Sequence, residues 1–90
     1  MEFEWDPKKS ETNRKKHGIS FPDAATIFAD PLAITFSDPD HSHGEHWLLT
    51  FGQSKMNLLL VVVHTERRGK TRIISARRAT RYERAIYEND

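Results

Sequence analysis

Arginine is concentrated in the last third of this 90-residue sequence. Residues 72–84, RIISARRATRYER, contain five arginines, and Arg67 and Arg68 lie shortly before them. The guanidinium group keeps its charge at working pH, and its planar fork donates two hydrogen bonds to a phosphate group. The segment therefore indicates a surface that binds phosphate or another anion.

Two basic blocks flank an acidic one along the chain. Residues 8–16 hold five Lys or Arg against one Glu, a balance of +4, and residues 67–84 hold eight against one, a balance of +7. Residues 30–50 hold four Asp or Glu and no Lys or Arg, a balance of −4. If the two basic blocks meet in space they form one anion-binding face, and otherwise they are two solvated surfaces.

The composition is that of an ordinary globular domain, with 37% hydrophobic and 30% charged residues. A chain of this length predicts a single domain over residues 1–90. The start, MEFEWDPKK, lacks the apolar region of a secretory signal, no run is long enough to span a membrane, and cysteine is absent. These features predict a cytoplasmic location with no membrane contact, and they exclude disulfides and thiolate chemistry.

Capping signals predict two helices in the first third of the chain. Asp6 as N-cap, Pro at the next position and Gly18 beyond the end predict a helix over residues 7–17. Ser20 and Asp23 form a predicted capping box for a short second helix, with Ala24, Ile27 and Phe28 facing inward, that stops before Pro31.

Four strands and a closing helix follow. Residues 32–37, 46–52, 57–66 and 71–77 have strand patterns, and Thr80 with Glu83 predicts a capping box for the last helix. The expected fold is α+β, with two N-terminal helices, an antiparallel four-stranded sheet and a C-terminal helix. We expect all three helices on one side of the sheet, which leaves the second face for a partner.

The hairpin at residues 66–71 sets an expected register. If Glu66 pairs with Thr71, then His64 lies opposite Ile73, Val62 opposite Ser75 and Leu60 opposite Arg77. His64 and Arg77 would then share one face of the sheet, with Arg72 on the other unless a bulge intervenes.

The segments FEWDPKKSETNRKKHGISFPDAATIFADP, VVVHTER and RIISARRATRYERAIYE closely resemble the BrnT family of type II toxin–antitoxin modules. The resemblance covers nearly the whole chain. It implies a RelE-like fold, metal-independent endoribonuclease activity on RNA that arrests growth, and neutralisation by a BrnA-type DNA-binding antitoxin. It also implies a hetero-oligomer with a dimeric antitoxin. Before the second strand this chain has Glu45-His46 where the family tends to have Glu-x-Arg or Glu-Arg.

Metal-free cleavage of RNA needs a base for the 2′-hydroxyl, cations for the phosphorane and an acid for the leaving oxygen. The predicted catalytic residues are Arg67, Arg72, Arg77, His64 and Glu45, with His64, Glu45 or a side chain near His17 as the base. The predicted RNA-binding residues are Lys16, His17, Arg78 and Tyr82. No cofactor or metal is expected, and the cluster of Asp and His in residues 38–46 is interpreted as a solvated loop rather than a zinc site. The alternative function is a noncatalytic module that binds nucleic acid or protein.

Overall fold

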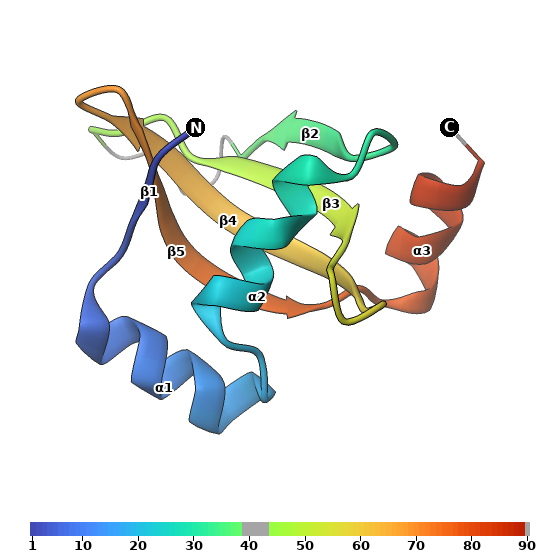
Figure 1. The fold of residues 1–90 in the computed structure, drawn as a ribbon. Coiled ribbons are helices and arrows are strands. Elements are labelled where there is room, and N and C mark those ends of the chain that lie inside the picture. Colours follow the sequence, from blue (N-terminus) through green and yellow to red (C-terminus); the bar gives the residue numbers. More distant parts are fainter. Residues whose placement is uncertain (39–43, 90) are drawn as a thin grey trace.

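The computed structural model describes residues 1–38 and 44–89 as one α+β unit. The order of elements is β1 (Phe3–Glu4), α1 (Pro7–His17), α2 (Phe21–Ala25), the 3-10 helix η1 (Thr26–Ala29), β2 (Ile34–Ser37), β3 (Leu48–Gln53), β4 (Leu59–Arg67), β5 (Lys70–Arg78) and α3 (Arg81–Glu88). The strands form one sheet in the order β1-β5-β4-β3-β2, as Figure 1 shows. The predicted α+β class is confirmed.

The sheet has five strands, so the prediction of four was wrong. The additional strand, β1, runs parallel to the edge of β5, and all other pairs are antiparallel. It consists of only two residues, Phe3 opposite Thr71 and Glu4 opposite Arg72. Two residues show no alternation, so no strand pattern was available to predict it.

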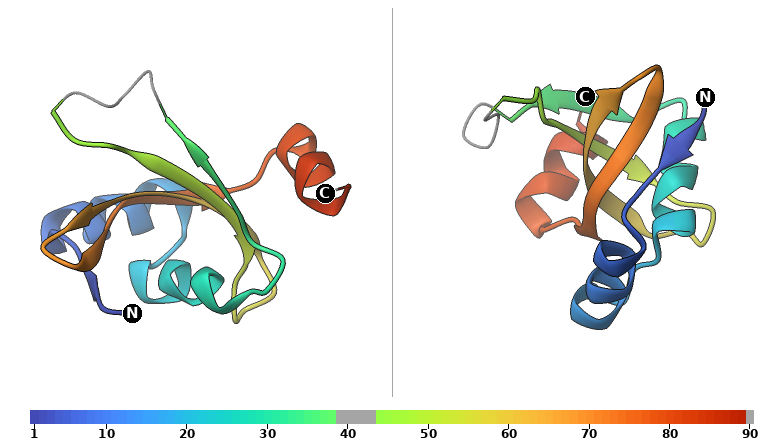
Figure 2. Two further views of the ribbon diagram at one scale, coloured as in Figure 1. Left: turned by 90° about the horizontal axis from the view of Figure 1, so that it is seen from above. Right: turned by 90° about the vertical axis from the view of Figure 1, so that its left-hand side faces the viewer.

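The helices cover both faces of the sheet, which corrects the expectation that one face stays open. Figure 2 shows α2 on one side of the strands and α3 on the other. The core under α2 contains Ile27, Leu60 and Val62. Val61 alternates with these two strand residues and is also fully buried, on the face where α3 lies. The apolar run of β4 is therefore covered from both sides at residues 59–62, whereas Val63, on the face of Val61, is only half-buried.

Capping explains where the helices begin and end. The Asp6 carboxylate accepts from the Lys8 N–H at 2.9 Å, and Gly18 closes α1 at φ 73° with its N–H on the Arg14 carbonyl. The Ser20 hydroxyl accepts from the Asp23 N–H at 3.1 Å. Thr80 and Glu83 form the predicted capping box of α3, with both reciprocal hydrogen bonds present.

A single buried side chain anchors α1, which has no aliphatic residue of its own. Asn13 donates to the Ala76 carbonyl at 2.8 Å and to the Ile19 carbonyl at 3.0 Å, and it accepts from the Ala76 N–H at 3.0 Å. Its side chain thereby satisfies the free edge of β5 in the way a neighbouring strand would.

A β-bulge in β5 changes the expected register. The pairs Glu66–Thr71 and His64–Ile73 form as predicted, but Ile74 is an extra residue, and Val63 pairs with Ser75. Beyond the bulge, Val62 lies opposite Ala76 instead of Ser75, and Leu60 opposite Arg78 instead of Arg77. Arg77 therefore pairs with Val61 and lies on the face opposite His64.

Candidate active site

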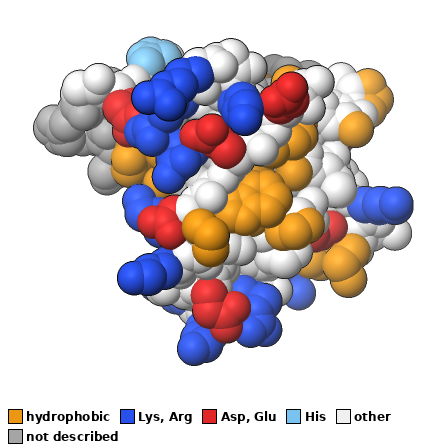
Figure 3. Space-filling view, turned by 60° about the vertical axis from the view of Figure 1, so that its left-hand side comes forward, with side chains coloured by type: hydrophobic (Ala, Val, Ile, Leu, Met, Phe, Trp, Pro, Cys, Tyr) orange, Lys and Arg blue, Asp and Glu red, His pale blue; other side chains and the backbone are white. Residues whose placement is uncertain are grey.

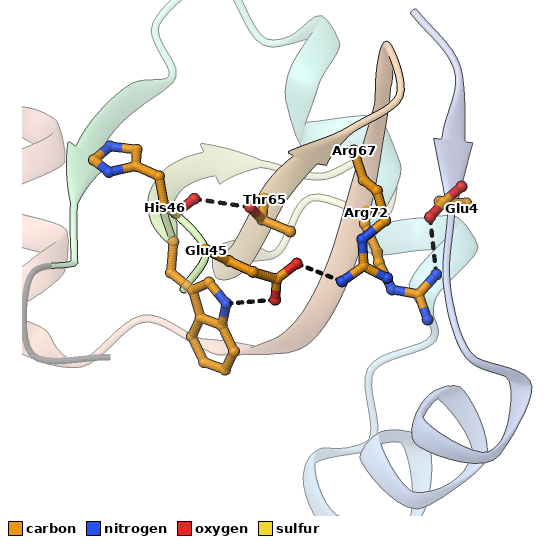
Figure 4. A network of polar contacts seen from close by, with 7 residues as sticks. Glu4, Glu45, His46, Thr65, Arg67 and Arg72 are labelled. Atoms are coloured by element: carbon orange, nitrogen blue, oxygen red, sulfur yellow. Dashed lines mark hydrogen bonds and ion pairs between the residues drawn. The ribbon is translucent and has the colours of Figure 1, made fainter. Parts of the chain in front are cut away.

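Arg67 and Glu45 form an ion pair where β4 ends. Arg67 is the last residue of β4, and its guanidinium donates to the Glu45 carboxylate, which also accepts from the Trp47 indole N–H at 3.3 Å (Figure 4). The Thr65 hydroxyl donates to the His46 carbonyl at 2.8 Å and so ties residues 45–47 to β4. The bond to Arg67, followed by that to Trp47, lowers the pKa of Glu45, so this carboxyl is ionised at neutral pH.

Arg72 adds a second guanidinium to this cluster. It pairs across the hairpin with Thr65 and donates to the Glu4 carboxylate of β1 at 2.9 Å. The charge of Arg72 also acts on Glu45, and that of Glu4 on Arg67, so two cations and two anions alternate. We call Glu4, Glu45, Arg67 and Arg72 the arginine cluster.

A hollow opens beside the arginine cluster. It has a volume of about 380 Å³, and its lining includes Glu45, His46, Thr65, Glu66 and Arg67. His46 is exposed, and its Nε2 lies 3.3 Å from the Ser37 hydroxyl. The hollow thus holds the guanidinium of Arg67 and the carboxylate of Glu45, whereas the ring of His46 points away from them (Figure 4).

Arg77 does not join the arginine cluster, although it was predicted with Arg67 and Arg72. It lies on the same face of β5 as Arg72 but five residues further along, roughly 15 Å at the usual strand rise. Both terminal nitrogens donate to the Glu83 carboxylate of α3, at 2.7 and 2.8 Å. This bidentate pair raises the pKa of Arg77 and lowers that of Glu83 to about 2.

The structure places His64 in the core, away from the arginines. The ring is 3% exposed, packs edge-on against Phe28 with centroids 4.9 Å apart, and bonds through Nε2 to the Thr50 hydroxyl at 2.7 Å. Within residues 1–38 and 44–89, Nδ1 has no hydrogen-bond partner. Desolvation lowers the pKa of His64.

The residues predicted to bind RNA lie on three separate parts of the surface. Lys16 and His17 line a hollow between α1 and β5, and Arg78 lines another with Arg14 and Asp23. Tyr82 on α3 is 76% exposed, so it is not a core residue. None of these side chains lies in the hollow beside the arginine cluster.

Sequence reasoning missed three members or neighbours of the site. His46 and Trp47 directly follow Glu45, and the succession of three polar or aromatic residues before a strand was an available signal. Glu4 gave no such signal, because its position follows from the unpredicted strand β1.

Asp40, His41 and His43 of the loop lie outside the described residues, and in residues 1–38 and 44–89 no three His, Asp or Glu side chains form a metal-binding group. The described helices are also too short and polar to cross a membrane.

Two guanidinium groups beside an open hollow form a site that can bind an anion such as a phosphodiester, and this site lies on a small α+β domain. A family model described as "Ribonuclease toxin, BrnT, of type II toxin-antitoxin system" matches residues 5–83. The chain belongs to this family, and it is a ribonuclease toxin whose substrate is RNA and whose partner is an antitoxin. The expected resemblance is thereby confirmed, and the noncatalytic module is disfavoured.

The fold agrees with a solved structure of this family. The crystal structure of the Brucella abortus ribonuclease toxin BrnT superposes with a TM-score of 0.69 and 24% sequence identity, over 90% of this chain and 99% of that chain. At this level of identity the similarity shows the shared fold. No curated protein sequence matches the chain.

Proposed function

We propose that the arginine cluster is the centre at which this toxin cleaves RNA, without a metal ion and in the cytoplasm. The observation that carries the proposal is the pair of guanidinium groups, Arg67 and Arg72, each held by a carboxylate beside a hollow that Arg67 and Glu45 line. A phosphate of the substrate would replace the carboxylates as acceptor. The guanidinium groups would then meet the extra charge of the phosphorane already oriented.

Two groups could move the protons. Glu45 is ionised, but the same bond to Arg67 that lowers its pKa makes it a weak base in the resting state. Release of Arg67 to the phosphate would weaken that bond and strengthen Glu45 as a base. His46 also lines the hollow, but its ring points toward Ser37 of β2, so it could serve the leaving oxygen only after its side chain turns toward Arg67 (Figure 4). Of the earlier candidates, His64 is buried and Arg77 is committed to Glu83, so we omit both from the proposed centre.

The test compares Arg67→Gln and Arg72→Gln with Arg68→Gln in the adjacent turn. Arg67 and Arg68 are both exposed, and in the described chain Arg68 has no ion pair. We expect each of the first two variants to cleave RNA roughly a hundredfold more slowly, as when one oxyanion donor is removed, and Arg68→Gln to keep the parent rate. Cleavage should persist in EDTA. Folded Arg67→Gln and Arg72→Gln proteins that cut RNA at the parent rate would refute the assignment.

We also propose that a BrnA-type DNA-binding antitoxin neutralises the toxin in a complex built on an antitoxin dimer. Membership of the BrnT family supports this proposal. The exposed apolar side chains Leu32 and Phe36 at the β2 edge of the sheet offer contact area. Light scattering of the co-purified pair should give a mass above that of one toxin and one antitoxin, and a strict one-to-one mass would contradict the proposal.

A further inference from the structure

The first helix forms one wall of a groove that the arginine cluster does not include. The groove has a volume of about 300 Å³, and it is lined by Lys8, Lys9, Lys16 and His17 of α1 and by Ile74 and Ser75 of β5. We call it the lysine groove. Figure 3 shows positive side chains at the bottom of this face, over α1, and again at the top near the β4–β5 turn, with hydrophobic side chains between them.

The lysines of the groove are not neutralised by the rest of the described chain. No carboxylate lines the groove, and the one acidic residue of α1, Glu11, pairs with Arg14 and Lys15 instead. Within residues 1–38 and 44–89, Lys8, Lys9 and Lys16 form no ion pair. By contrast, Arg67, Arg72 and Arg77 each have a carboxylate partner.

Helix stability does not account for the lysines at the start of α1. Lys16 and His17 lie in the last turn, where the helix dipole favours cations, but Lys8 and Lys9 lie in the first turn, where it disfavours them. The first turn also contains no acidic residue. These two lysines therefore add positive charge where the helix itself gains nothing from it.

The groove is fixed in shape and lies next to the site. Lys9, Thr12, Asn13 and Lys16 follow the spacing of one helix face, and Asn13 fastens that face to Ala76 of β5 through two hydrogen bonds. Lys9 and Lys16 are about 10 Å apart along the helix axis, which is farther than one phosphate group extends. Ser75 in the floor of the groove follows Arg72 by three residues on β5, about 10 Å.

We propose that the lysine groove binds the sugar–phosphate backbone of the RNA substrate at nucleotides that flank the one cleaved in the arginine cluster. The proposal rests on the proposed function, because it takes that cluster as the point of cleavage. Several separated ammonium groups without carboxylate partners can each contact a different phosphate of one strand, and such contacts do not depend on the base sequence. An acidic segment of a protein is the competing occupant, and the test includes it.

The experiment measures how salt weakens the binding of a labelled, uncleavable 2′-O-methyl oligonucleotide of about ten residues. Each phosphate contact on a single strand contributes a slope of about 0.7 to log K against log [salt]. The triple variant Lys8→Gln/Lys9→Gln/Lys16→Gln should therefore lower the slope by about 2. With equal affinity at 1 M salt, that is about a hundredfold weaker binding at 0.1 M. In cleavage assays the variant should raise KM more than it lowers kcat.

A matched control removes three cations elsewhere, with Lys15→Gln/Lys55→Gln/Arg84→Gln. The slope of log K against log [salt] for this control should fall below that of the parent by less than about 0.7, the contribution of one phosphate contact. Equal slopes for parent and groove variant would overturn the proposal. So would a groove variant that binds RNA as the parent does but no longer binds the antitoxin, since this would make the groove a protein-binding surface.

Failure of this inference is separable from failure of the proposed function. If Arg67→Gln and Arg72→Gln retain full activity while the groove variant loses the salt slope, the lysine groove binds RNA and the cleavage centre is misplaced. If the arginine variants lose activity while the groove variant binds as the parent does, the cleavage centre stands and the groove proposal is wrong.

Discussion

Replacement of Arg77 by Gln tests whether the third arginine serves the fold rather than the substrate. Arg77 lies on β5, and its two terminal nitrogens hold the Glu83 carboxylate of α3. The helix itself has no buried residue, so this pair and the hydrogen bond from Tyr87 to Asp30, at 2.6 Å, are its main polar attachments. Loss of the pair should therefore loosen α3 from the sheet.

The expected magnitude follows from the pKa of Glu83. A decrease from 4.5 to about 2 corresponds to roughly 3 kcal/mol for all interactions that favour the ionised carboxylate. Thr80 contributes part of this through the capping box, and the Arg77 side chain is 39% exposed, so water screens the pair. We assign about 1–2 kcal/mol to Arg77, which is a decrease in Tm of roughly 5–10 °C for a domain of this size.

The assay is thermal unfolding as a function of pH, with the neighbouring Arg78→Gln as control. Because the pKa of folded Glu83 lies below that of the unfolded chain, its contribution is complete above pH 4.5 and is lost as the pH falls from 4.5 to about 2. Arg77→Gln should melt at lower temperature than the parent at neutral pH and lose less on acidification. Arg78 is exposed and has no ion pair in the described chain, so its variant should follow the parent. If Arg77→Gln and Arg78→Gln melt together, the reasoning is wrong.

Three further substitutions probe the core. Asn13→Ala removes three buried hydrogen bonds and leaves the Ala76 N–H unpaired, so urea unfolding should show a loss of about 2–4 kcal/mol, and a loss below 1 kcal/mol would contradict the anchoring role. Because the pKa of folded His64 is lowered, the parent protein should lose stability as the pH falls below about 6.5. His64→Gln should lose less stability between pH 7 and 5 in chemical denaturation, and equal losses in the two proteins would argue against a neutral buried ring. Gly52→Ala would place a Cβ 3.0 Å from the Cβ of Ile27 and should lower the free energy of unfolding by about 1–3 kcal/mol. An unchanged Tm would show that Ile27 shifts to accommodate the new methyl group.

Local signals in the sequence predicted the elements well. Asp6, Gly18, Ser20 and Thr80 act at their own helix ends, and a cap depends only on residues within one turn of it. The strands begin or end within two residues of the predicted limits for the same reason, since alternation is a local property.

Features that depend on distant residues were missed. The bulge at Ile74 is an insertion in one strand relative to another, so no pattern within β5 alone reveals it, and it moved Arg77 to the face opposite His64. The buried role of Asn13 depends on Ala76, 63 residues away, and in sequence Asn13 is one more polar residue of a polar helix. Of the predicted catalytic set, the structure therefore brings together Glu45, Arg67 and Arg72 only.

The attachment of the first helix to the last strand has a consequence for how the toxin is made. Asn13 must wait for Ala76, and a ribosome that adds about 5–20 residues per second needs roughly 3–13 s to synthesise the 63 positions between them. Glu4 likewise cannot pair with Arg72 until the 68 positions that separate them have been synthesised. A chain released by a stalled ribosome before residue 72 thus has neither an anchored α1 nor the Arg72 guanidinium of the arginine cluster. Residues up to Ala76 must therefore be synthesised before α1 can be anchored to β5.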